Sequence, residues 1–196
     1  INGFKINFGA NYEFAKYNNS TFNKIFRQSP LTGESSVDTI DFSTQFNMNK
    51  YGLFGQISKN LLKNRLLISM GIRADGADVN GKAQNLINQL SPRISASYTI
   101  NDKFSLNANY GIYYQLPAYT ILGYTENDEF VNKEMAQYVR AEHYVSGIEY
   151  RPSTSERFTV EGFYKRYSNY PVSVSKGISL ANLGADFGVI GNEQIN

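Results

Sequence analysis

A tyrosine-rich segment near the middle of the chain holds the residues best suited to binding a ligand. Large aromatic rings supply contact area at a low cost in conformational entropy. The segment 116–139 also contains the acids Glu126, Asp128 and Glu129. We therefore predict an aromatic binding platform formed by Tyr113, Tyr114, Gln115, Tyr119 and Tyr124. The alternative is a belt of rings at a strand end, followed by an ordinary loop.

Catalytic and metal-binding chemistry has little support in the sequence. There is no cysteine, which excludes disulfides and thiolate metal sites, and His143 is the only histidine. Nothing ties a serine to His143 in a nucleophile arrangement, so a structural role is the simpler interpretation. Residues 78–81 resemble the start of a calcium loop, but its first position would be Gly76 and its twelfth Ile87, neither an acid. We predict no enzyme activity, no metal and no cofactor.

A two-residue alternation must position these side chains. The even positions from Phe4 to Phe14 are apolar or aromatic while those between them are polar or glycine, and a similar alternation returns from Phe104 to Tyr114. A period of two places successive side chains on opposite faces of a β-strand. The pattern predicts seven strands, over residues 3–16, 39–59, 65–75, 92–100, 103–115, 140–150 and 157–168.

The second of these strands changes parity along its length. Its apolar residues stand first on even and then on odd positions, as Ile40, Phe42, Phe46 and Met48 and then Tyr51, Leu53 and Ile57. One extra residue would restore a common facing, so we predict a β-bulge near Asn49 and Lys50.

Charged residues fall on the parity opposite to the apolar stripe, as Lys5, Glu13, Arg73, Asp75, Arg93, Glu149, Arg157, Glu161 and Lys165. If the stripe faces lipid, the opposite face lines a lumen. The residues that we expect to meet a plug or a substrate there are Arg73, Asp75, Arg93, Glu149, Glu161 and Lys165. The alternative is the solvated face of an ordinary sheet.

The predicted connections alternate between short and long. Residues 60–64, 101–102 and 151–156 form short turns, whereas 17–38, 76–91 and 116–139 form long loops and 169–196 trails after the last strand. In an up-and-down antiparallel sheet all the short turns share one end, as the short periplasmic turns of outer-membrane barrels do. Eleven tilted residues rise about 26 Å, close to the apolar band of a bilayer. The expected fold is all-β, an antiparallel up-and-down transmembrane β-barrel segment.

Several global features limit the interpretation further. The net charge of +2 gives no reason to expect a nucleic-acid partner, and no run of apolar residues is long enough for a transmembrane helix. No signal segment precedes the strand pattern at Ile1, so we expect an export signal to lie outside this sequence. Bacterial barrels have even strand counts, and seven strands therefore predict that residues 1–196 are a single partial β-barrel domain.

Several short motifs of the sequence indicate a family. The stretch LLISMGIRAD at 66–75, followed by SPRISASY at 91–98, resembles a pair of strands in TonB-dependent outer-membrane receptors. Those receptors show a glycine–aliphatic–arginine–x–aspartate strand end and then a strand that begins with SPR. The resemblance continues through NDKFSLNANYGIYYQLPAY at 101–119, RAEHYVSGIEYR at 140–151 and RFTVEGFYKRYSNYP at 157–171.

The resemblance implies a barrel of about 22 strands around an N-terminal plug. Such a receptor lies in the outer membrane of Gram-negative bacteria and imports a siderophore, glycan, cobalamin, peptide or similar scarce ligand. It implies as partners the outer-membrane lipid, the plug domain of the same parent chain, the TonB energising complex and a surface lipoprotein. The plug and the remaining strands would lie outside this chain.

Two other classes compete with this interpretation. One is a soluble or surface-attached antiparallel β domain that uses its tyrosines for binding or adhesion. The other is an outer-membrane enzyme with a small barrel, which lacks a visible catalytic set. Purification separates the first from a barrel wall, because a barrel wall needs detergent or refolding.

Overall fold

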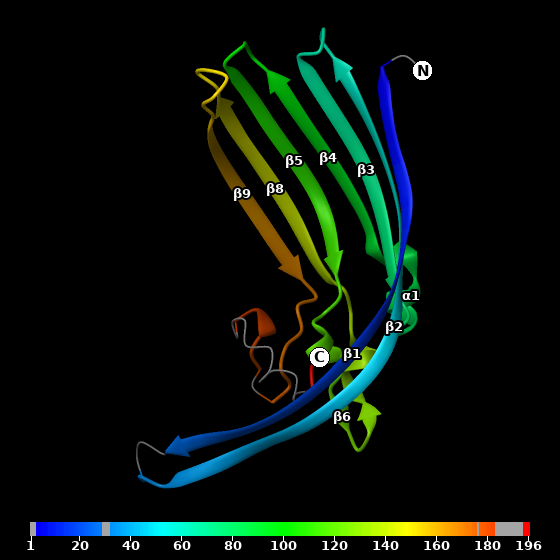
Figure 1. Ribbon diagram of the computed structural model, residues 1–196, viewed down its shortest axis with the longest axis vertical. Helices are drawn as coiled ribbons and strands as arrows, with labels where there is room; N and C mark the ends of the chain where they lie inside the picture. Colours follow the sequence, from blue (N-terminus) through cyan, green and yellow to red (C-terminus); the bar gives the residue numbers. More distant parts are fainter. Residues whose placement is uncertain (1–2, 29–31, 176, 183–193) are drawn as a thin grey trace.

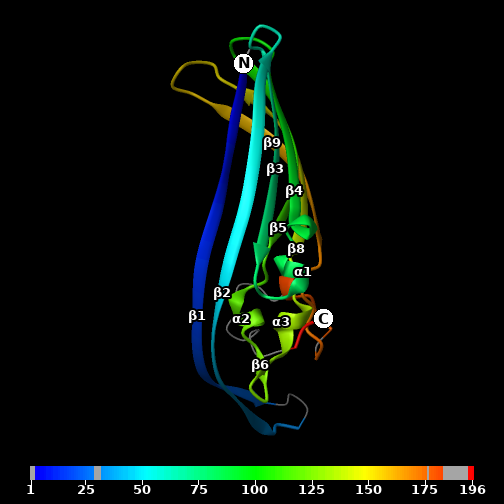
Figure 2. The same ribbon diagram turned by 90° about the vertical axis from the view of Figure 1, so that its right-hand side faces the viewer.

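The described part of the chain forms one large antiparallel β-sheet. The computed structural model describes residues 3–28, 32–175, 177–182 and 194–196. Within them seven strands pair in the order β1-β2-β3-β4-β5-β8-β9. Their bounds are Phe4–Gln28 for β1, Ser35–Leu61 for β2, Leu66–Ala77 for β3, Leu90–Thr99 for β4, Phe104–Gln115 for β5, Val139–Tyr150 for β8 and Phe158–Ser168 for β9. The sheet is curved, with β1 and β9 at its edges (Figures 1 and 2). The predicted all-β, up-and-down barrel segment is confirmed, and these residues do not close a barrel.

Where all seven strands pair, their apolar stripes lie on one face. Directly paired residues of neighbouring antiparallel strands point to the same side of a sheet. The registers align one row across the whole sheet, composed of Ile6, Ile57, Met70, Ile94, Tyr110, Tyr144 and Tyr164. We call this side the outer face: the even residues of every sheet strand except β2, and the odd residues of β2. The opposite side is the inner face.

Three tight turns lie together at one end of the sheet, the upper end in Figure 1. In the first, Leu62, Lys63 and Asn64 all have positive φ. In the second, the side-chain oxygen of Asn101 accepts hydrogen bonds from the backbone N–H groups of Lys103 and Phe104, at 2.9 and 3.0 Å. The third spans residues 151–157. These turns lie where the sequence predicts them.

The predicted long loop over residues 17–38 is wrong. β1 continues to Gln28, β2 begins at Ser35, and their pairing runs without interruption from Phe4–Lys59 to Gln28–Ser35. The two strands thus form a hairpin that extends well beyond the other strands (Figure 1). The outer face of this extended part of the hairpin is exposed to water, so residues 17–28 need no alternation of apolar and polar side chains. Only the backbone hydrogen bonds to β2 identify these residues as a strand. The predicted alternation of short and long connections therefore fails at this first connection.

The predicted β-bulge near Asn49 and Lys50 is also wrong. The β1–β2 and β2–β3 registers are regular through these residues. The change of parity instead marks the point where the apolar residues of β2 pass from the outer face to the inner face. Leu53 belongs to the outer face and is 55% exposed, whereas Phe46 and Met48 point to the inner face and are only 6% and 3% exposed. The side chain of Ile40, which the prediction also used, lies outside the described residues.

The remaining long connections gather at the end opposite the tight turns. Residues 78–89 contain α1 (Gly81–Gln84) and the 3₁₀ turn η1 (Leu86–Gln89). Residues 116–138 contain α2 (Tyr119–Leu122), the small β6–β7 hairpin (Thr125–Glu126 and Glu129–Phe130) and α3 (Val131–Met135). The described residues after β9 include η2 (Leu180–Asn182). We call these three segments the cap; residues 116–138 and the described residues after β9 lie within the curve of the long hairpin, whereas α1 lies beside the ends of β2 and β3 (Figures 1 and 2).

Residues 116–138 of the cap pack on the inner face of the extended hairpin, whereas Gln84 of α1 accepts a hydrogen bond from the outer-face residue Tyr51. Phe46 and Met48 of β2 form a buried cluster with Leu122 of α2 and with Ala136. The cluster is bordered by partly buried residues of β1 and of the cap, which are Ala15, Tyr17, Val79, Leu116, Tyr119 and Phe130. Burial of apolar area is the main force that holds such segments together. The hairpin therefore serves as the platform on which the cap is built.

Candidate functional site

The six residues predicted to face a lumen all lie on the inner face. They are Arg73, Asp75, Arg93, Glu149, Glu161 and Lys165. Arg93 and Lys165 share one level of the sheet, because the row between them runs through Gly111 and His143. Their contact with a plug or a substrate stays a prediction.

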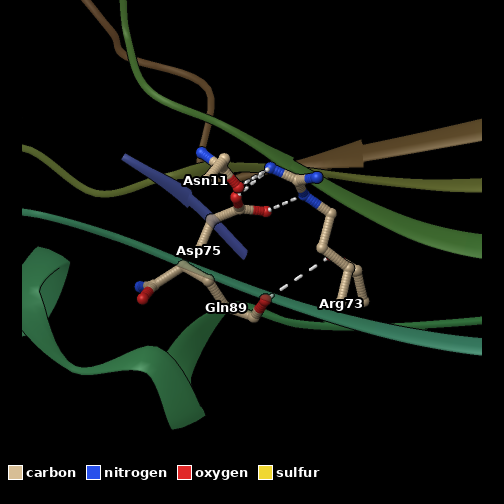
Figure 3. Close-up of polar contacts among 5 residues, drawn as sticks. Asn11, Arg73, Asp75 and Gln89 are labelled. Atoms are coloured by element: carbon tan, nitrogen blue, oxygen red, sulfur yellow. Dashed lines mark hydrogen bonds and ion pairs between the residues drawn. The ribbon is translucent and has the colours of Figure 1, made fainter. Parts of the chain in front are cut away.

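Arg73, Asp75 and Asn11 form a polar cluster near the cap. The Arg73 guanidinium donates from Nε to one oxygen of Asp75 at 2.6 Å and from Nη2 to the other at 2.5 Å. The same Nη2 donates to the side-chain oxygen of Asn11 at 3.0 Å. Figure 3 shows the three side chains converging. Gly52 lies opposite both Asn11 and Asp75, and a Cβ at Gly52 would approach their oxygens to 2.6 and 2.5 Å. A larger residue would therefore displace the cluster.

A cavity of about 450 Å³ lies beside this cluster and carries charge on its walls. Besides the residues above, it is lined by Glu13 and Lys50, whose Nζ–Oε1 distance is 2.6 Å. Lys50 also donates to the hydroxyl of Tyr119 at 2.7 Å. Within the described residues, each charged side chain lining this cavity is paired with another: Glu13 with Lys50, and Arg73 with Asp75. We call it the charged cavity.

A second cavity of about 830 Å³ opens between the inner face of β5, β8 and β9 and the segment that follows β9. Its rings are Tyr113, Tyr114, His143, Tyr167 and Tyr170. We call it the tyrosine cavity. The two cavities share a wall that consists of Tyr114 and residues 115–118.

Packing across the sheet fixes the Tyr113 ring. A Cβ at Gly111 would come within 2.9 Å of that ring, so only glycine leaves room for the ring to lie over the backbone. The Arg93 guanidinium lies 4.5 Å from the centroid of the Tyr113 ring, and the His143 ring centroid lies 4.7 Å from it. A cation near an aromatic ring is attracted by the quadrupole of that ring. Tyr113 is thereby held between β4 and β8.

The structure separates the five residues of the predicted aromatic platform. Tyr113, Tyr114 and Gln115 line the tyrosine cavity, and Tyr119 lines the charged cavity. Tyr124 lies elsewhere: its ring packs against Phe42 of the long hairpin, with centroids 6.4 Å apart, and its hydroxyl donates to Glu126. Tyr124 thus contributes to neither of the two cavities.

Sequence reasoning missed Tyr167 and Tyr170 as cavity residues and assigned His143 a structural role. All three line the tyrosine cavity. A signal was present for Tyr167, because its parity is opposite to that of the outer-face residue Tyr164 in the same strand. For Tyr170, which follows the strand, no pattern in the sequence points to the cavity.

Two buried asparagines join the cap segments to one another. Asn80 donates from Nδ2 to the carbonyls of Lys133 and Ala136, at 2.6 and 2.9 Å, and its oxygen accepts from the backbone of Ala83 in α1. The Nδ2 of Asn132 donates to the carbonyl of Ile121 at 2.9 Å. The oxygen of Asn132 accepts from the backbone N–H of Ile195, also at 2.9 Å. All three cap segments are therefore connected through these two buried side chains.

Burial changes the ionisation of two cap residues. Burial raises the pKa of the Tyr138 hydroxyl, with a further contribution from the charge of Asp75, and this keeps the hydroxyl protonated beside the charged cavity. Burial also lowers the pKa of Lys133, which Asp78 partly opposes. The ammonium of Lys133 lies 3.8 Å from the ring centroid of Phe130 and 4.3 Å from that of Phe46. Lys133 thus covers the hydrophobic cluster from the cap side.

The segment that resembled a calcium loop has a structural role. The Asp78 carboxylate accepts hydrogen bonds from the backbone and side-chain nitrogens of Asn49, at 2.7 and 2.6 Å. Across the described residues, no group of three or more His, Cys, Asp or Glu is placed to hold a metal ion. None of the described helices combines the length and apolar character needed to cross a membrane.

Fold and surface together define the class of protein. A sheet with an apolar, ring-rich outer face, a polar inner face, tight turns at one end and structured loops at the other is a wall segment of an outer-membrane β-barrel. Residues 2–194 match the model of the family described as TonB dependent receptor-like, beta-barrel. The chain belongs to this family, which consists of outer-membrane transport receptors rather than enzymes. Neither a curated protein nor a solved structure gives a significant match.

Proposed function

We propose that this chain forms part of the wall and the extracellular cap of an outer-membrane receptor that captures a scarce nutrient, such as a siderophore or a glycan. Import would then use energy delivered through TonB. One observation carries the proposal: apolar and aromatic side chains form an aligned row across the outer face of the sheet, while the charged cavity and the tyrosine cavity lie on the inner face. Lipid on one side and ligand on the other match this division.

The other parts of the receptor would come from the parent protein. Residues 1–196 would constitute one partial barrel domain of a barrel with about 22 strands. The plug domain of the same parent chain would occupy the lumen and meet the inner-face charges, and the TonB energising complex would act through that parent. A surface lipoprotein would cover the cap from outside. The family supports the plug and the TonB interaction.

A soluble binding or adhesion domain is the competing function. It would leave the aligned outer-face row, from Ile6 to Tyr164, in contact with water over the whole width of the sheet. Exposed apolar surfaces of that extent are rare in soluble monomers. The outer face therefore favours the membrane.

Surface labelling tests the orientation. A short epitope is inserted into the parent protein at Gly33, beside the tip of the long hairpin, or at Lys63, in a tight turn. We expect antibody to bind the Gly33 epitope on intact cells, and to bind the Lys63 epitope only after the outer membrane is permeabilised. The opposite pattern, or labelling of both epitopes on intact cells, would contradict the proposed orientation.

Transport is tested without knowing the ligand in advance. Spent medium is compared from cells that lack the parent protein, from cells that lack TonB and from unmodified cells. We expect at least one compound to be consumed by unmodified cells and to remain in the medium of both mutants. If loss of the parent protein leaves every TonB-dependent compound consumed, uptake is not its function.

A further inference from the structure

The tyrosine cavity has an uncharged lining. Besides its five rings, its described walls consist of aliphatic residues and prolines, together with the amide of Gln115 and the hydroxyl of Ser179. No Asp, Glu, Lys or Arg is among these lining residues. Arg93 and Lys165, the charged side chains at the level of His143, stack instead on the Tyr113 and Phe163 rings, at 4.5 and 5.2 Å from the centroids. A bound anion would meet no charge partner on these walls.

The rings follow one another across the sheet. The His143 ring lies 4.7 Å from that of Tyr113 and 6.4 Å from that of Tyr167, and Tyr170 lies 6.3 Å beyond Tyr167. Tyr167 and Tyr170 remain 54% and 37% exposed, so each presents open ring surface. The cavity thus offers several aromatic positions in series rather than one enclosed slot.

We propose that the tyrosine cavity binds a neutral oligosaccharide, an inference that rests on the proposed receptor function and narrows its ligand class. A sugar ring has an apolar face of C–H groups that packs on aromatic rings, and hydroxyls at its rim that require hydrogen-bond partners. Tyrosine supplies both an apolar ring and a polar tip, and Gln115 and Ser179 add further polar groups. A chain of sugar rings matches the series of side-chain rings.

Charge and volume distinguish this ligand from the alternatives. An anionic chelate would lose hydration without gaining a partner charge, which disfavours its transfer into an uncharged cavity. The neighbouring charged cavity offers no free charge either, since its described ionic groups are paired with one another. The volume of about 830 Å³ lies in the usual range for a small-molecule site.

Binding is measured on the intact parent receptor in detergent, with an array of neutral and acidic oligosaccharides and an iron–catecholate complex as probes. Calorimetry then follows the strongest binder with two variants. Tyr167→Leu removes a ring of the cavity, whereas Tyr164→Leu removes a ring of the same strand on the outer face. We expect a neutral oligosaccharide to bind best, Tyr167→Leu to weaken it by about tenfold or more, and Tyr164→Leu to leave its affinity within about twofold.

Three outcomes would overturn the inference: binding of no neutral member of the array, stronger binding of the acidic members or the iron complex, or equal affinities of the two variants. Each variant is first checked for assembly by the heat-dependent mobility of the barrel on a gel, so that misfolding is not mistaken for lost binding. A receptor that passes the labelling and medium tests but fails here retains its proposed function with a different ligand. A receptor that fails the medium test loses the proposed function whatever it binds on the array.

Discussion

The two halves of β2 have the same backbone pairing and opposite surfaces. From Tyr51 to Leu61 most apolar side chains point outward, as Leu53 and Ile57 do, and these two remain exposed in the isolated sheet, while Phe54 points to the inner face over Gly9. From Phe42 to Met48 they point inward and are buried under the cap. The register passes from one half to the other without interruption. The difference therefore arises from what surrounds each half, not from any change in the strand.

This contrast shows how one strand can cross from a membrane into water. Inside the bilayer the outer face must be apolar because lipid is its solvent. Beyond the bilayer the outer face meets water, and the only dry side is the inner face beneath the cap. Apolar residues occupy whichever face is shielded from water. The two-residue alternation therefore continues along β2, but the apolar residues change from one parity to the other.

The largest effect is expected from Phe46→Ala, which removes a ring from the cap cluster. Large-to-small changes of a buried phenylalanine cost about 3–5 kcal/mol. The loss should fall on the cap, so residues 116–138 should become sensitive to protease on intact cells while the barrel still assembles. Gln45→Ala, an exposed position in the same stretch, is the control. A variant that loses barrel assembly together with cap protection would show that the two halves are not energetically separate.

Substitution of Phe8 by Arg tests the membrane half. Phe8 lies on the outer face, and Asn7 beside it lies on the inner face. An arginine on the lipid face costs about 2–4 kcal/mol near the midplane. We expect Phe8→Arg to lower the assembled fraction, measured by heat-dependent gel mobility, and Asn7→Arg to be tolerated. Equal tolerance of arginine at both positions would refute the assignment of the outer face to lipid.

Asn132→Ala addresses the connections within the cap. It removes the hydrogen bonds to Ile121 and Ile195 and leaves buried backbone groups without them. Such a loss costs about 1–3 kcal/mol. Hydrogen exchange of the Ile195 amide should accelerate, with little change in the strands. Glu134→Ala, at an exposed position of the same helix, should not alter that exchange rate.

The smallest effect is expected at the tight-turn end of the sheet. Arg157 pairs with the buried carboxylate of Glu149 at 2.7 Å, but its own side chain is largely exposed, and Arg151 pairs with the same carboxylate at 2.6 Å. Exposed ion pairs contribute about 0–1 kcal/mol. Arg157→Gln should therefore shift the thermal unfolding midpoint only slightly. A shift as large as that of Phe46→Ala would mean that the turn end, and not the cap, limits stability.

Much of the sheet could be predicted because lipid imposes a simple rule on each strand that crosses it: every second side chain, on the face toward the lipid, must be apolar. Strands β3, β4, β5, β8 and β9 lie within two residues of the predicted ranges. The rule no longer applies at residues 17–38, where both faces of β1 and β2 leave the bilayer. There the prediction mistook a long hairpin for a loop, and near Asn49 and Lys50 it mistook a reversed apolar phase for a bulge.

The candidate site was predicted only in part, for a similar reason. The period of β5 points Tyr113 and Gln115 to the inner face, where they line the tyrosine cavity, whereas Tyr114 has the opposite parity and lines the cavity from the end of the strand. Tyr119 and Tyr124 belong to the cap, where no period operates, and packing against Phe46 and Phe42 sends them elsewhere. Tyr170 is brought into the cavity by the course of the chain after β9.

By itself the sequence determined the class of the sheet, the facing of its membrane-spanning residues and the family, because the bilayer allows few arrangements and a two-residue period reveals them. Only the tertiary structure decided how far the first hairpin extends, which face the cap covers and which rings meet around each cavity. Those features depend on contacts between distant segments, such as Asn80 with Ala136 and Asn132 with Ile195. The sequence identifies tyrosines that could bind a ligand, but the packing of the chain determines which of them line the same cavity.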